Sequence, residues 1–134
     1  MERGNASIVA VIDDDQDVGA VLGRLLETMG YQVETYCSGM DFLSVAHLDR
    51  LACLVVDQVL PGISGIDALE VLRERQVGLP AIVITSSPDA RLRARTRLAD
   101  ACLIEKPLLN DLLTRAIRSL LSPSAGPARA SAKA

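Results

Sequence analysis

Short apolar runs alternate with amphipathic stretches along almost the whole chain. The run LACLVVD, residues 51–57, is rich in Val and Leu, ends in a carboxylate and is soon followed by a Pro-Gly break. Such a run predicts a strand buried on both faces, as in a parallel sheet covered by helices. Four shorter runs predict further strands over Ser7 to Ile12, Tyr31 to Tyr36, Ala81 to Ile84 and Ala101 to Ile104.

The segments between these runs carry apolar residues at helical spacing. Ser followed three residues later by Asp predicts a capping box at the start of two of them. Ser87-Pro88 predicts the N-cap and first residue of another. The expected helices cover Val18 to Met29, Ser38 to Leu48, Ser64 to Leu72, Asp89 to Leu98 and Leu109 to Leu120.

Strands that alternate with helices predict an α/β fold, because each helix returns the chain to the same edge of a parallel sheet. The expected architecture is a doubly wound, flavodoxin-like (βα)5 fold with a parallel five-stranded sheet in the order 2-1-3-4-5. One domain should cover residues 1–121. Residues 122–134, a mixture of Pro, Ala, Ser and Gly without periodicity, predict a disordered C-terminal tail or a truncated linker.

Composition narrows the class of protein. The 134 residues suffice for one domain with a core, and a hydrophobic fraction of 49% argues against disorder. No apolar run approaches the roughly 20 residues of a membrane span, so we expect a cytoplasmic protein without membrane contact. The net charge of -3 gives no general attraction to nucleic acid. Three widely spaced cysteines predict buried reduced thiols rather than disulfides.

Four of the five predicted strands end in a polar residue that could take part in chemistry. Asp13 and Asp14 follow the first strand, Asp57 the third, Thr85 the fourth and Lys106 the fifth. These strands are neighbours in the predicted order, so the four positions should converge at the carboxyl edge of the sheet, where α/β proteins bind ligands. Chance placement of Lys106 at a solvated strand end is the alternative.

This set of side chains suits a metal and a phosphoryl group. Carboxylates from two strands repel each other at one point, and Mg2+ prefers an oxygen-only site of one or two carboxylates with water. A lysine and a hydroxyl group on the opposite side would complete a site for a dianionic phosphoryl group.

The chain resembles the receiver domains of two-component response regulators from about Ser7 to Leu121. The resemblance rests on IDDD at 12–15, Asp57 followed by LPG at 60–62 and SG at 64–65, ITS at 84–86 and EKP at 105–107. It implies a phosphoacceptor that is no enzyme toward other substrates, although it phosphorylates and dephosphorylates itself with Mg2+. A sensor histidine kinase would donate the phosphoryl group to Asp57. The signal would leave through the fourth helix, fifth strand and fifth helix.

The resemblance also implies two groups of site residues. The magnesium site would be formed by Asp13, acting through water, and by Asp14, Asp57 and the backbone carbonyl of Val59. The phosphoryl and switch residues would be Thr85, Ser86, Lys106, Pro107 and Leu103. The Lys106-Pro107 bond would be cis.

Two departures from the family's pattern bear on the switch. Leu103 stands where the family usually carries Phe or Tyr, a ring that normally swings inward as Thr85 moves, so ring switching is not expected here. Four arginines occupy alternate positions of residues 91–97. A solvated helix and a partner-docking surface formed by Arg91 and Arg95 are both open.

Other classes of protein fit less well. The DxDxD pattern from Asp13 lacks the Gly and Glu of a calcium loop, and three acids replace the phosphate-binding loop of a nucleotide binder. A metal-dependent aspartyl-phosphate phosphohydrolase needs an acid two residues after its nucleophile, where this chain has Val59.

The output of the domain is open. We favour a stand-alone receiver that signals to another protein. The alternative is an N-terminal receiver fragment of a two-domain DNA-binding transcriptional regulator, although direct DNA contact by this chain is not expected.

Overall fold

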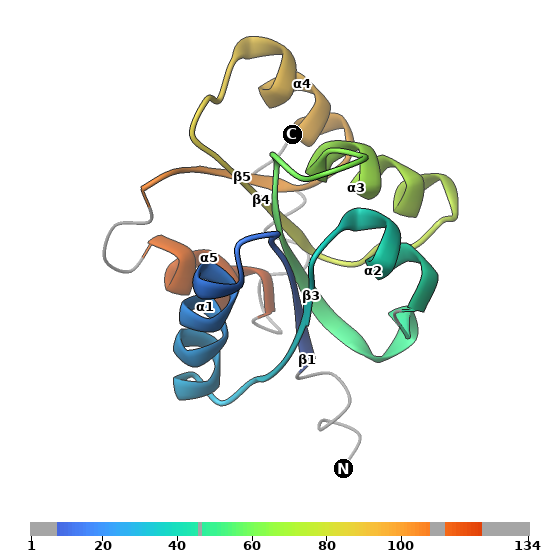
Figure 1. The fold of residues 1–134 in the computed structure, drawn as a ribbon. Coiled ribbons are helices and arrows are strands. Elements are labelled where there is room, and N and C mark those ends of the chain that lie inside the picture. Colours follow the sequence, from blue (N-terminus) through green and yellow to red (C-terminus); the bar gives the residue numbers. More distant parts are fainter. Residues whose placement is uncertain (1–7, 46, 108–111, 122–134) are drawn as a thin grey trace.

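A parallel sheet with helices on both faces forms the domain (Figure 1). The computed structural model describes residues 8–45, 47–107 and 112–121. Within these residues the strands are β1 (Ile8–Ile12), β2 (Gln32–Tyr36), β3 (Leu51–Asp57), β4 (Ala81–Thr85) and β5 (Cys102–Glu105). Every neighbouring pair is parallel, and the order is β2-β1-β3-β4-β5. The predicted fold class and strand order are confirmed.

The helices divide between the two faces of the sheet (Figure 1). They are α1 (Gln16–Thr28), α2 (Gly39–Val45), α3 (Gly65–Glu74), α4 (Ala90–Leu98) and α5 (Leu112–Leu121), with a short 3-10 helix at Leu48–Arg50. Helices α1 and α5 cover one face, and α2, α3 and α4 cover the other. Among the described residues, no helix is long and apolar enough to cross a membrane.

Alternation along the central strands explains this layering. In β3, Cys53 and Val55 face the layer of α1 and α5, whereas Leu54 and Val56 face that of α2, α3 and α4. All four side chains are almost completely buried. Full burial of each aliphatic side chain contributes about 1.5–3 kcal/mol, so this central strand fixes the position of the residue at its end, Asp57.

The predicted start of α4 is wrong. The N-cap is Asp89, whose carboxylate accepts the Leu92 N–H at 2.8 Å. Ser87 and Pro88 lie before the helix, and the Ser87 N–H donates instead to Thr85 Oγ1 at 3.1 Å. Asp caps a helix as well as Ser does, and here Ser87 belongs to the loop that follows β4.

Two smaller predictions also need correction. The second helix ends at Val45 rather than Leu48, and exposed His47 lies outside it, at the N-cap of the 3-10 helix. Cys37 is exposed because it follows β2, a partly exposed edge strand, whereas Cys53 is buried and Cys102 half-buried. The predicted beginning of the last helix at Leu109 and the predicted tail at 122–134 lie outside the described residues.

Candidate functional site

The strand register brings the predicted site residues to one edge of the sheet. Ile12 pairs with Val56, so Asp13 and Asp57 leave neighbouring strands at the same level. Thr85 pairs with Glu105 in the same way, and the Lys106 N–H donates to the Thr85 carbonyl at 2.7 Å. Residues from four strands therefore meet at the carboxyl edge, as predicted.

Three carboxylates form the acidic part of the site. Oxygens of Asp13, Asp14 and Asp57 all lie within 4.8 Å of one another. Asp13 and Asp57 are only 8% and 7% exposed, whereas Asp14 is exposed. Burial raises the pKa of Asp13, and the nearby negative charge of Asp57 raises it further. A hydrogen bond from the Asp15 N–H at 2.9 Å lowers the pKa but does not cancel the rise. The cluster thus confines repelling charges that a cation would relieve.

The buried oxygen of Asp57 is short of partners. Lys106 Nζ lies 3.2 Å from Asp57 Oδ1 as an ion pair, yet this oxygen accepts no hydrogen bond from a described residue. An orphaned carboxylate oxygen beside two further acids fits a hard divalent cation such as Mg2+, which takes oxygen ligands. The ion pair also shows that Lys106 is more than a solvated strand end.

The hydroxyl side of the site is formed by the loop after β4. Thr85 is 3% exposed, and its Oγ1 accepts the Ser87 N–H, so the hydroxyl hydrogen is free to be donated elsewhere. Ser86 is exposed next to it. The Lys106-Pro107 bond is cis, as the resemblance implied. Leu103 is half-buried against the core layer of α2, α3 and α4.

Gln58, directly after Asp57, anchors the loop that carries the predicted metal ligand Val59. Its N–H donates to the Ile84 carbonyl at 2.8 Å. Its carbonyl and side-chain oxygens accept the N–H groups of Gly65 and Ile66 at 3.0 and 2.8 Å. These three hydrogen bonds were not predicted from the sequence, because no sequence pattern indicates which groups a loop glutamine will bind. The Val59 side chain is 71% exposed.

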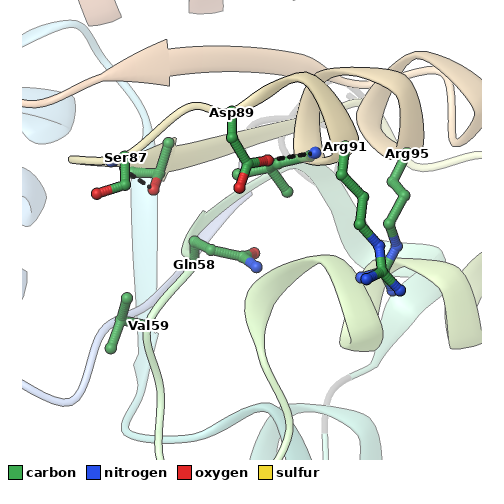
Figure 2. A pocket seen from close by; sticks show the side chains of 8 residues that line it. Gln58, Val59, Ser87, Asp89, Arg91 and Arg95 are labelled. Carbon is green, nitrogen blue, oxygen red and sulfur yellow. Dashed lines mark hydrogen bonds between the residues drawn. The ribbon is translucent and has the colours of Figure 1, made fainter.

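The two arginines predicted as a partner surface differ in their surroundings. Arg91 is exposed, whereas the guanidinium of Arg95 forms ion pairs with Asp67 and Glu70 of α3. Both side chains point from α4 toward the start of α3 (Figure 2). They line a cavity of about 360 Å3 between α4 and the loop after β3. The other lining residues are Gln58, Val59, Thr85, Ser87, Asp89 and Leu92.

Comparison with known proteins agrees with this geometry. The family model described as the response regulator receiver domain matches residues 9–118. The transcriptional regulatory protein FixJ of Azorhizobium caulinodans is 38% identical over 87% of this chain and 56% of its own. The response regulator protein TodT of Pseudomonas putida is 31% identical over 87% of this chain and 52% of its own.

A solved structure shows the same fold. The response regulator StyR superposes with a TM-score of 0.80 at 33% sequence identity, covering 93% of this chain and 64% of the StyR chain. The chain spans about half the length of the curated relatives it matches.

Proposed function

This chain belongs to the response regulator receiver family, and from that premise we propose that it accepts a phosphoryl group from a sensor histidine kinase on Asp57. The observation that carries the proposal is the state of this carboxylate. It is buried, carries an oxygen without a hydrogen bond, and lies beside two acids and the Lys106 ammonium. A cytoplasmic location is part of the proposal, because the donor kinase would deliver the phosphoryl group there.

The proposed step is a displacement at phosphorus. A carboxylate oxygen of Asp57 forms a bond to phosphorus while the bond from phosphorus to the donor imidazole nitrogen breaks. Lys106 holds a positive charge 3.2 Å from the same carboxylate and offsets the charge that arrives. Val59, two residues on, supplies no acid to a leaving group, so we propose a phosphoacceptor rather than a phosphohydrolase.

Asp13, Asp14, Asp57 and the Val59 carbonyl are the residues that would hold Mg2+. When bound, the ion neutralises charge on the phosphoryl oxygens. The protein's own contribution is position: β1 and β3 fix the buried acids at one level, and Gln58 fixes the loop that carries Val59.

The switch would begin at Thr85. The hydroxyl of this buried residue can donate to a phosphoryl oxygen once Asp57 is modified, which draws the loop of Ser86 and Ser87 toward the site. Helix α4 follows directly after this loop, and half-buried Leu103 of β5 can change rotamer without a ring flip. We therefore propose that the surface of α4, β5 and α5 carries the signal, with exposed Arg91 on it.

An apolar groove beside the site suits the donor kinase. Its volume is about 580 Å3. The groove is lined by Asp17, Val18, Val21 and Leu22 of α1 together with Ser86, Lys106 and Pro107. Val21 is 65% exposed, whereas Leu22 and Leu26 of the same helix are buried in the core. We propose that an apolar helix face of the kinase docks here, which brings its phosphohistidine to Asp57. A Val21→Lys variant should then lose transfer from the kinase and keep phosphorylation by acetyl phosphate.

A transcriptional output is the second candidate for the step after phosphorylation. FixJ carries the words transcriptional regulatory protein in its name, and this chain spans about half of its length. We propose that the switched surface acts on a DNA-binding output, either a separate protein or a further domain. Gel-shift assays with the longest chain encoded by the gene would test this.

Intact-mass analysis tests the phosphoacceptor proposal. Acetyl phosphate with Mg2+ should add one phosphoryl group to the wild-type chain and none to Asp57→Asn. Asp49→Asn, a change at an exposed position in the 3-10 helix, is the matched control and should be phosphorylated normally. Equal phosphorylation of Asp57→Asn would refute the assignment.

A further inference from the structure

One arginine ties helix α4 to the start of α3. Arg95 Nε donates to one oxygen of Glu70 at 3.0 Å, and Nη2 contacts the other Glu70 oxygen and Asp67 Oδ1, the latter at 3.0 Å. One carboxylate therefore binds the guanidinium through two nitrogens and a second binds it through one, an arrangement with strict geometry. Between 30 and 46% of each side chain is exposed, so solvent partly screens these ion pairs.

Asp67 connects this contact to the phosphoacceptor loop. Its second oxygen accepts the Ser64 N–H, and Ser64 Oγ accepts the Asp67 N–H, both at 3.2 Å, which forms the capping box of α3. The N–H groups of Gly65 and Ile66, which follow Ser64, donate to Gln58, the residue after Asp57. The first turn of α3 is thus hydrogen-bonded on one side to Arg95 of α4 and on the other side to Gln58, the residue beside the phosphoacceptor.

The other end of α4 is attached to Thr85 through the loop that precedes Asp89. A cavity of about 360 Å3 separates this region from the loop after β3 (Figure 2). Arg95 reaches α3 from the edge of this cavity, so its contacts resist any movement of α4 away from α3. The Arg95–Asp67 ion pair has a nitrogen–oxygen distance of 3.0 Å, and a direct ion pair extends to about 4 Å. A displacement of α4 from α3 by about 1 Å would therefore break it.

We propose that Arg95 is a positioning residue that holds α4 in the resting state and is released when Thr85 moves toward the modified Asp57. The clasp, defined as Arg95 with Asp67 and Glu70, then sets how readily the domain switches. This inference rests on the proposed function. If the clasp stabilises the resting state only, its removal must strengthen binding of any ligand that favours the switched state.

Arg95→Gln tests the clasp, with Arg93→Gln as the matched control on the same helix. Arg93 is exposed and forms no ion pair with a described residue. Arg95→Gln should bind beryllofluoride with Mg2+ about two- to fivefold more tightly, as expected for loss of a partly exposed pair. Amide hydrogen exchange of the free protein should be faster over Ala90–Leu98 and the first turn of α3. Arg93→Gln should change neither quantity.

A double-variant cycle with Glu70→Gln separates the clasp from general damage. Once Arg95 is replaced, the further change at Glu70 should add little, because the shared contact is already absent. Additive effects, or beryllofluoride binding that is unchanged or weaker in Arg95→Gln, would overturn the inference. Failure of the wild-type protein to bind beryllofluoride would refute the proposed function instead. In that case the clasp would be tested without beryllofluoride. Hydrogen exchange of the free protein and the same double-variant cycle, measured through the free energy of unfolding, would decide whether the clasp exists.

Discussion

Gly65→Ala probes how closely α3 approaches the phosphoacceptor. A Cβ atom at this position would lie 2.5 Å from the backbone oxygen of Asp57 and 3.1 Å from its carbonyl carbon. Real contacts of this kind are not below 3.0 Å, so α3 or the end of β3 has to shift by at least 0.5 Å. Overpacking against rigid backbone costs about 1–3 kcal/mol, and the shift would fall on Asp57 and on the Gly65 N–H bond to Gln58.

Urea unfolding and Mg2+ titration measure the two consequences. Gly65→Ala should lower the free energy of unfolding by about 1–3 kcal/mol and weaken Mg2+ binding. Gly19→Ala is the control, since Gly19 lies within α1 and an added Cβ there would meet nothing within 4 Å. That change should stabilise the protein by roughly 0.5–1 kcal/mol and leave Mg2+ affinity unchanged. A Gly65→Ala protein as stable as Gly19→Ala, with normal metal binding, would refute the close approach.

Three further predictions concern the site and its surroundings. Asp14→Ala should weaken Mg2+ binding at least tenfold by calorimetry, because it removes one of three clustered carboxylates; unchanged affinity would place the metal elsewhere. Thr85→Ala should still accept the phosphoryl group at Asp57 but lose the change in hydrogen exchange over α4; retention of that change would exclude Thr85 as the link. Arg95 holds the pKa of Asp67 below its ordinary value of 3.8, so their contribution to stability is present above that value and lost as the pH falls through the lowered pKa. The stability difference between wild type and Asp67→Asn should therefore shrink in acid, and a difference that grows there would contradict the assignment.

The features that the sequence predicted are those with a local or periodic signal. Five apolar runs indicated the strands. Few topologies are available to a short chain of alternating strands and helices, so the strand order could be predicted, and that order places the carboxylates and the lysine at the strand ends close together. Asp57 and Lys106 lie 49 positions apart, yet both could be assigned to the same edge because each lies at the carboxyl end of an apolar run. The capping box at Ser64 is likewise a pattern over four residues.

The features that were missed depend on contacts between distant segments. Arg95 and Asp67 are 28 residues apart, and alternate arginines on one helix do not reveal which of them meets an acid. The start of α4 was misplaced because Ser87 and Asp89 are equally good caps, and only the hydrogen bond from Ser87 to Thr85 decides between them. The close approach of Gly65 to the Asp57 backbone also depends on packing, and a glycine in the sequence does not indicate which segment packs against it.

Locating the phosphoryl group tests the central claim most directly. The protein would be treated with acetyl phosphate and Mg2+, reduced with borohydride, which converts an aspartyl phosphate to homoserine, and digested for peptide sequencing by mass spectrometry. We expect homoserine at position 57 and nowhere else, and none when Mg2+ is chelated. Homoserine at Asp13 or Asp14, or the absence of any modified peptide from fully folded protein, would contradict the assignment of Asp57 as the phosphoacceptor.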